Sequence, residues 1–289
     1  MRRPFLPRQN CCSRSATQGA ALEIGGTSQI IRKETAMMNT LLKAFVIIGV
    51  FLTNTMETST AKANTPHPTD TLETSPADAT IPYPKGATAL LSIDPYNDFL
   101  PEDGKMWPAL REVSIAVDLL ANLVKIRAAV RDAEHPIFIL PHHRHRAGDF
   151  EGWANLTPFQ AAAHERQMFA EGSRGGDWYE GFGPEAGDVV VKEHWGASSF
   201  ANTDLDAQLR QHGITHVILV GAIANTCTEA TARHAVELGY HVTLVRDATA
   251  AMSPEALHAA HEINGPTYAH AILTTAQIVQ QIGVEAQSE

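Results

Sequence analysis

Cysteine and long apolar runs are both scarce in this chain of 289 residues. It has three cysteines, and Cys11 and Cys12 lie in the N-terminal segment, so the rest of the chain, with Cys227 alone, can form no internal disulfide. The apolar run Ala44 to Leu52 is shorter than the roughly 20 residues that span a bilayer. These shortages exclude a disulfide scaffold and predict no stable membrane insertion of the mature domain.

Basic residues are also few once the N-terminal region is set aside. The whole chain has 22 Lys and Arg against 32 Asp and Glu, and residues 64–289 hold 14 of the former and 29 of the latter. An acidic surface repels phosphate backbones, so no nucleic-acid partner is predicted. The 44% hydrophobic content suffices for one sizeable core. We expect one folded domain, a small-molecule substrate and a homo-oligomer.

The N-terminal region carries export signals rather than a fold. Residues 1–36 show no hydrophobic periodicity and are interpreted as an over-extended gene model, with translation starting at Met37 or Met38. The run Ala44 to Leu52 has the length of a signal-peptide core, and Ala61-Lys62-Ala63 fits signal peptidase. This predicts a signal peptide over 37–63, a flexible leader over 64–81, a domain over 82–284 and a periplasmic or secreted location. An uncleaved N-terminal anchor is the alternative.

From about residue 82, apolar runs alternate with amphipathic patterns. Ser114 to Asp132, 227–239 and Pro254 to Ile263 are expected to be helical. Six runs are expected to be strands: 87–93, 136–140, 188–192, 216–223, 241–245 and 271–274. This alternation predicts an α/β fold, a three-layer αβα sandwich on a mainly parallel sheet. The long irregular stretch 141–187 is expected to be functional or to carry a lid.

Three reactive side chains follow predicted strands. Asp94 follows the first, Lys192 ends the third and Cys227 follows the fourth. Ligands of open α/β sheets bind beyond the carboxyl ends of the strands, so an acid, a base and a thiol are expected to meet there. Thr226-x-x-Glu229 resembles a capping box that places Cys227 in the first turn of a helix. The helix dipole and Lys192 would then lower the pKa of the thiol, and Asp94 would accept its proton.

Three blocks resemble the isochorismatase-like cysteine hydrolase superfamily, which includes nicotinamidases, N-carbamoylsarcosine amidase and ureidoacrylate amidohydrolases. They are Leu91 to Phe99, Val191 to Phe200 and Gly221 to Arg233. The resemblance implies the sheet order 3-2-1-4-5-6 and a triad of Asp94, Lys192 and Cys227. It also implies an oxyanion hole from the backbone N–H groups of Ile223 and Cys227, and a cis peptide between Ala222 and Ile223.

The chain departs from that family pattern at two places. Tyr96 stands where the family has Gln. The loop after the second strand holds His142, Arg144 and Phe150 where nicotinamidases place metal ligands. No metal and no cofactor is therefore predicted, although the histidines of 142–145 keep a zinc site open as an alternative. Tyr96, Phe99, Trp195 and His142 are the candidate substrate-binding residues.

The sequence thus predicts an amidohydrolase, an enzyme acting on non-peptide carbon–nitrogen bonds through a thioester acyl-enzyme. A vinyl-ether hydrolase of the isochorismatase type is one alternative, and a non-catalytic periplasmic thiol sensor or binding module is another. A Cys–His peptidase is disfavoured because no histidine occurs in a block that resembles such a site.

Overall fold

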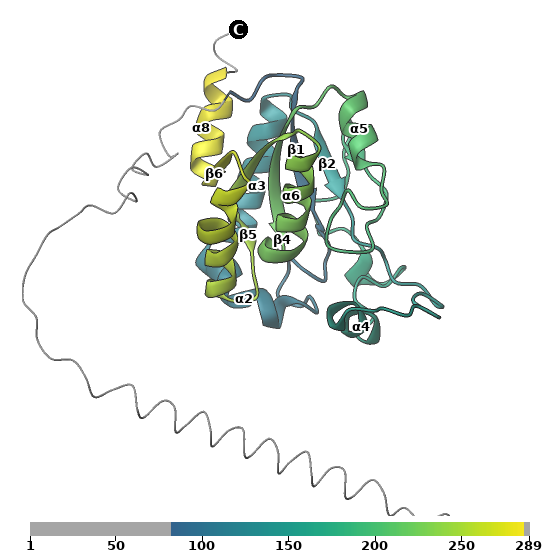
Figure 1. The fold of residues 1–289 in the computed structure, drawn as a ribbon. Coiled ribbons are helices and arrows are strands. Elements are labelled where there is room, and N and C mark those ends of the chain that lie inside the picture. The colour runs from purple at the N-terminus through teal and green to yellow at the C-terminus, as the bar shows by residue number, and fades with distance from the viewer. Residues whose placement is uncertain (1–81, 286–289) are drawn as a thin grey trace, which may run out of the picture. The chain divides into compact units, whose positions relative to one another are not determined.

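The computed structural model describes residues 82–285, which form one six-stranded parallel sheet in the order β3-β2-β1-β4-β5-β6 (Figure 1). The predicted fold class and strand order are both confirmed. The predictions for 1–36, 37–63 and 64–81 lie outside the described residues. The strands are β1 (Thr88–Ile93), β2 (Ile137–Leu140), β3 (Val189–Val190), β4 (His216–Ala222), β5 (His241–Ala250) and β6 (Ala271–Leu273).

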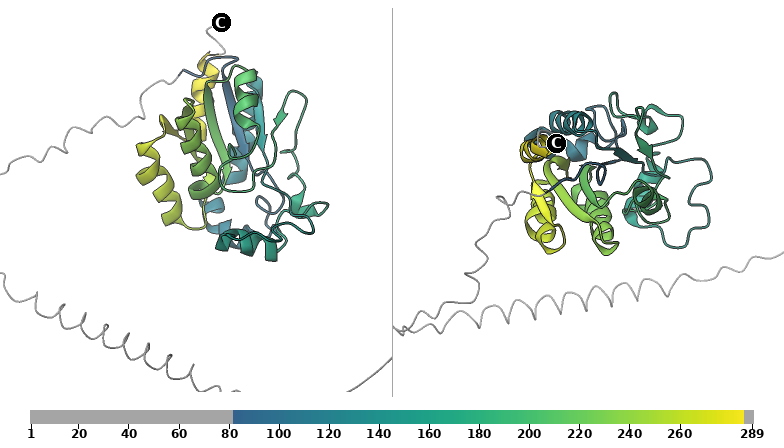
Figure 2. Two further views of the ribbon diagram at one scale, coloured as in Figure 1. Left: turned by 45° about the vertical axis from the view of Figure 1, so that its right-hand side comes forward. Right: turned by 90° about the horizontal axis from the view of Figure 1, so that it is seen from above.

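Helices cover both faces of the sheet, because successive side chains of a strand point to opposite sides. Leu90 of β1 belongs to an apolar core with residues of α2, α3 and α8, whereas Leu91 belongs to a second core with residues of α5 and α6. Seen from above, the helices lie on the two sides of the sheet (Figure 2). The bounds of these helices are α2 (Trp107–Ala116), α3 (Leu119–Asp132), α5 (Leu205–Gln211), α6 (Glu229–Glu237) and α8 (Thr275–Glu285).

Two predicted helices differ from the observed ones. The single helix expected over Ser114 to Asp132 is two helices, because Asp118 between them adopts the left-handed conformation with φ +50°. The Asn122 side chain donates to the Val117 carbonyl at this break, which satisfies a helix-end acceptor. The predicted helix from Pro254 becomes α7 (Pro254–His258) followed by a π-helical turn over Ala259–Asn264. Ser253 caps α7 by accepting from the Ala256 backbone N–H.

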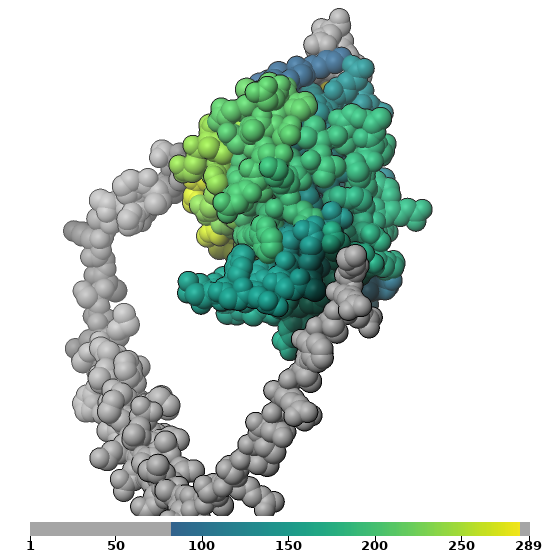
Figure 3. Space-filling model, turned by 90° about the vertical axis from the view of Figure 1, so that its right-hand side faces the viewer, coloured from purple at the N-terminus to yellow at the C-terminus, as the bar shows by residue number. Residues whose placement is uncertain are grey.

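The stretch 141–187 contains one short helix, α4 (Pro158–Glu165). Thr157 and Gln160 form a capping box at its start. Figure 1 shows α4 set apart from the two helical layers, and in the space-filling view the teal part of this stretch projects from the body (Figure 3). Among residues 82–285, no helix is long and apolar enough to cross a membrane.

The carboxyl ends of β1 and β4 approach each other closely. Ile93 pairs with Gly221, whose φ is +120°, and a Cβ atom built on Gly221 would lie 2.2 Å from the Ile93 carbonyl oxygen. Only glycine fits here, because any side chain would collide with backbone. The contact brings Asp94, the residue after β1, next to the turn that follows β4.

Candidate active site

Asp94 is fixed at the end of β1 with its side chain fully buried. Its backbone N–H donates to the Leu140 carbonyl at 2.9 Å, and its φ of +52° turns the chain sharply away from the strand. Oδ1 of the carboxylate lies 3.1 Å from Nε2 of His194. Within the described part of the chain, the other oxygen, Oδ2, has no N–H or O–H partner, and the Cys227 thiol is the group that interacts with the free side of the carboxylate. One carboxylate oxygen is therefore left to accept another proton.

Cys227 lies in a turn of π-helix, Ala224–Thr228, that joins β4 to α6. The peptide between Ala222 and Ile223 is cis, as the resemblance implied. The predicted capping box is wrong: the Thr226 hydroxyl donates to the Ile223 carbonyl, and α6 begins at Glu229 without a side-chain cap. The π turn replaces the first α-helical turn, so Thr226 and Glu229 do not have capping geometry. Single π turns of this kind recur at functional sites.

The surroundings of Cys227 raise the pKa of its thiol, which is the opposite direction to the predicted lowering. Burial raises the pKa of Cys227 well above its usual range, and the negative charge of Asp94 raises it further. Hydrogen bonds from the Thr226 hydroxyl and from the Ile223 backbone N–H lower it by less. The sulfur therefore lies beside the carboxylate that could take its proton and beside an N–H group of the predicted oxyanion hole.

Lys192 is not part of this arrangement. Its side chain is exposed, and its backbone N–H donates to Oδ1 of Asp204. The strand expected over 188–192 is β3, only Val189–Val190, so the chain leaves the sheet earlier than predicted. The structure thus brings Asp94 and Cys227 together and leaves the exposed side chain of Lys192, the third member of the predicted triad, apart from them.

His194 occupies the place beside Asp94 that Lys192 was expected to fill. Its backbone extends the sheet edge, since its N–H donates to the Pro141 carbonyl and its own carbonyl accepts from His143. The side chain is fully buried between Asp94 and the Gly196 carbonyl. His194 was not among the site residues predicted from the sequence. The order Lys192-Glu-His194 could have pointed to it. Because β3 ends at Val190, two residues before Lys192, the buried position beside Asp94 falls on His194 instead of on Lys192.

A pocket of about 220 Å³ has Cys227 in its lining. Its wall is formed by the segment after β3, by α4 and by the π turn, and the lining is mainly apolar. The lining residues are His142, Thr157, Phe159, Gln160, Trp195, Gly196, Ala197, Thr226 and Cys227. Trp195 and His142, both predicted to bind substrate, line this pocket. Phe159 and Gln160 of α4 were not predicted, because only the fold brings α4 over the thiol.

Tyr96 and Phe99, which were predicted to bind substrate, lie in the core and are not among the residues that line the pocket. Tyr96 stacks on Trp178, with ring centroids 5.0 Å apart, and its hydroxyl donates to the His142 carbonyl. Phe99 stacks on Phe169. Both follow the sharp turn at Asp94, which directs them into the apolar layer under α2 and α3.

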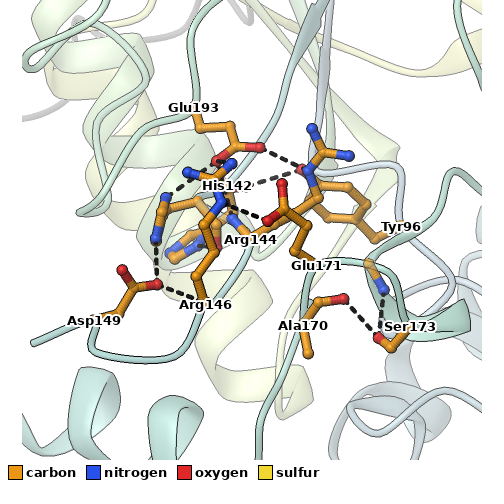
Figure 4. A network of polar contacts seen from close by, with 11 residues as sticks. Tyr96, His142, Arg144, Arg146, Asp149, Ala170, Glu171, Ser173 and Glu193 are labelled. Atoms are coloured by element: carbon orange, nitrogen blue, oxygen red, sulfur yellow. Dashed lines mark hydrogen bonds and ion pairs between the residues drawn. The ribbon is translucent and has the colours of Figure 1, made fainter. Parts of the chain in front are cut away.

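An ion-pair network lies next to His142, one of the residues that line the pocket (Figure 4). Glu193 binds the Arg144 guanidinium and the His143 ring, and His143 also contacts Asp149. Burial raises the pKa of Glu193, but hydrogen bonds from His143 and Arg144 outweigh it and lower the pKa to about 2. The His143 ring stacks on Trp195 with centroids 3.4 Å apart, so the network fixes the indole that lines the pocket.

The histidines of the loop 142–145 serve packing and ion pairs. Burial lowers the pKa of His142 to about 4, so this pocket residue is neutral near pH 7. The described residues contain no group of three His, Cys, Asp or Glu side chains placed to hold a metal ion. The zinc alternative therefore gains no support from the geometry of residues 82–285.

The parallel sheet carries Asp94 and Cys227 at its carboxyl edge, and comparison with known proteins identifies the family that has this fold. Residues 88–277 match the family model described as "Isochorismatase domain". The isochorismatase family protein YddQ of Bacillus subtilis is 32% identical over 163 residues, which are 56% of this chain and 77% of that protein. The ureidoacrylate amidohydrolase RutB of Pantoea ananatis is 26% identical over 211 residues, which are 69% of this chain and 84% of that protein.

Solved structures show the same fold. A cysteine hydrolase from Pseudomonas syringae aligns with a TM-score of 0.60 at 23% identity, covering 71% of this chain and 96% of that one. A pyrazinamidase/nicotinamidase from Streptococcus mutans aligns with a TM-score of 0.52 at 26% identity, covering 65% and 100%. The chain belongs to the isochorismatase family. This confirms the predicted resemblance and the prediction that the protein is an enzyme of the hydrolase class.

Proposed function

We propose that this protein is a cysteine-dependent amidohydrolase that cleaves the carbon–nitrogen bond of a small amide or ureide. The observation that carries the proposal is the Cys227 thiol, which lines a pocket and lies beside the buried Asp94 carboxylate. Relatives named amidohydrolase and nicotinamidase support this bond type. A vinyl-ether hydrolase would have no use for a thiol at the base of its pocket.

The reaction would proceed through a thioester. Asp94 accepts the Cys227 proton as the sulfur attacks the substrate carbonyl, and the backbone N–H groups of Ile223 and Cys227 stabilise the resulting oxyanion. The C–N bond then breaks, and Asp94 returns the proton to the leaving amine or ammonia. Water, deprotonated by the same carboxylate, hydrolyses the thioester and restores the thiol.

The pocket favours a neutral, planar substrate. Phe159 and Trp195 present aromatic surface, and His142 is uncharged near pH 7 because burial lowers its pKa to about 4. The cations of the neighbouring loop are already paired, Arg144 with Glu193 and Arg146 with Glu171. Among residues 82–285, no lysine or arginine that could bind a carboxylate lines the pocket. We therefore expect an uncharged carboxamide or ureide, whereas the name ureidoacrylate denotes an anion.

The test is hydrolysis of matched substrate pairs by the full chain. Ammonia release is measured for nicotinamide, benzamide and phenylurea, each compared with an analogue that carries a carboxylate. The proposal predicts turnover of at least one neutral compound and weaker turnover of its charged partner. Cys227→Ala should abolish turnover. Full turnover in Cys227→Ala would exclude the thioester.

Export and self-association are also proposed. Export rests on the sequence of 37–63, and N-terminal sequencing of the protein from its native host would reveal cleavage after Ala63. Retention of the residues before it would favour an uncleaved anchor. Self-association is tested by light scattering of the purified protein, and a monomer would contradict it.

A further inference from the structure

His194 faces two hydrogen-bond acceptors at once. Its Nδ1 lies 2.7 Å from the Gly196 carbonyl oxygen, and its Nε2 lies 3.1 Å from Oδ1 of Asp94. A carbonyl oxygen can only accept, so Nδ1 carries a proton and donates it. In a neutral ring Nε2 would then carry no proton, so its lone pair would face the lone pairs of the Asp94 carboxylate oxygen Oδ1.

A second proton on the ring removes that conflict. With both nitrogens protonated, the imidazolium donates to the Gly196 carbonyl and forms an ion pair with Asp94. The side chains of His194 and Asp94 are both 0% exposed, so this pair is shielded from water and its charges interact strongly. Burial alone lowers the pKa of His194, but the charge and hydrogen bond of Asp94, with the Gly196 bond, outweigh it and raise the pKa.

We propose that His194, not Lys192, is the positively charged residue that holds Asp94 ionised and oriented toward Cys227. Because Oδ1 is engaged by His194, Oδ2 is the oxygen left to take the thiol proton. His194 is a positioning residue, since it acts through Asp94 and does not line the pocket. The assignment deepens the proposed amidohydrolase function and rests on it for its effect on rate.

A histidine in this role makes the site sensitive to pH where a lysine would not. A lysine ammonium ordinarily stays charged to about pH 10.4, whereas an imidazolium loses its proton several units lower. The titratable groups that act on His194 are Asp94 after β1, His142 after β2, and Glu193 in its own segment. The two carboxylates favour the imidazolium, and His142 is itself neutral near pH 7. Activity is therefore expected to fall on the alkaline side as His194 loses its proton.

The first experiment reads the protonation state without using activity. The imidazole ¹⁵N signals of the full-length protein are followed against pH, and His194→Gln identifies the signal that belongs to His194. We expect both ring nitrogens to be protonated at pH 7 and to titrate above 6.5, and Asp94→Asn to shift the titration downward. A ring that is neutral at pH 7 in the wild type would overturn the proposal, whatever substrate the enzyme uses.

The second experiment reads the consequence for turnover, on whichever amide the substrate panel identifies. His194→Gln should lower kcat on the order of 100-fold. His194→Lys should keep a positive charge at this position. It should therefore shift the alkaline limb of the kcat/KM profile to higher pH, by more than one pH unit. Lys192→Gln is the matched control and should leave both kcat and the profile unchanged within about twofold.

The outcomes separate the two proposals. Two results would refute the assignment of His194 as the cation beside Asp94. One is a folded His194→Lys variant whose alkaline limb of the kcat/KM profile does not move. The other is a collapse of turnover in Lys192→Gln, which would return the role of the cation to Lys192. If Cys227→Ala retains full turnover, the amidohydrolase mechanism fails, and the ¹⁵N titration still decides whether His194 is the cation beside Asp94. Where His194→Lys does not fold, the ¹⁵N titration of the wild type decides alone.

Discussion

Replacing Asp94 with Asn separates thiol reactivity from catalysis. The change removes the negative charge beside Cys227 and keeps the size of the side chain. Asn also tolerates the left-handed backbone of position 94, where φ is +52°. Because Asp94 raises the pKa of the thiol, its neutralisation should lower that pKa and increase the thiolate fraction at neutral pH. The variant should therefore react faster with iodoacetamide than the wild type.

Turnover should change in the opposite direction. An amide side chain cannot accept the thiol proton or return it to the leaving amine, and such proton transfer contributes about 10²–10⁴-fold to a rate. This corresponds to about 3–5 kcal/mol of transition-state stabilisation at 1.36 kcal/mol per factor of ten. We expect kcat to fall by at least 100-fold while alkylation accelerates.

The assay pairs ammonia release with the rate of iodoacetamide labelling from pH 5 to 10. Asp118→Asn is the matched control, since Asp118 also has a left-handed backbone, with φ +50°, and is exposed at the break between α2 and α3. It should change neither rate. Slower alkylation in Asp94→Asn, or turnover close to that of the wild type, would refute the role of Asp94 as the proton acceptor beside the thiol.

Three further predictions follow from the described residues. Gly221→Ala should destabilise the fold by about 3 kcal/mol or more in urea unfolding, because its Cβ would lie 2.2 Å from a backbone oxygen. Gly187→Ala is the control. A Cβ atom built on Gly187, where φ is +93°, would have no neighbouring atom within 4 Å, so this change should cost only about 1–2 kcal/mol of backbone strain. Burial lowers the pKa of His261 to about 4, so its contribution to stability is present above pH 6.5 and is lost as the pH falls to 4. His261→Gln should lessen that loss by up to about 3 kcal/mol, and an equal acid dependence in both proteins would contradict this. Activity should survive exhaustive chelation, and loss with EDTA followed by recovery with zinc would contradict the metal-free prediction.

Much of the fold could be read from local patterns. Continuous apolar runs such as Ala87 to Ile93 signal strands buried on both faces, and their alternation with helical patterns fixes a parallel sheet. Breaks inside helices could not be read in this way. The left-handed residue Asp118 and the π turns at Ala224–Thr228 and Ala259–Asn264 depend on how the helices pack, and local propensity carries no signal for them.

The sequence by itself determined that an aspartate and a cysteine follow neighbouring strands, because a parallel sheet places residues after β1 and β4 at one edge. Only the tertiary structure decided which side chain lies beside Asp94 at this edge. A strand that ends at Val190 rather than at Lys192 exposes the lysine and buries His194, and strand ends are set by pairing with the neighbouring strand rather than by composition. The environment of the thiol was decided in the same way. Its pKa depends on burial and on the distance to Asp94, which are properties of the folded chain and not of the residues around Cys227 in sequence.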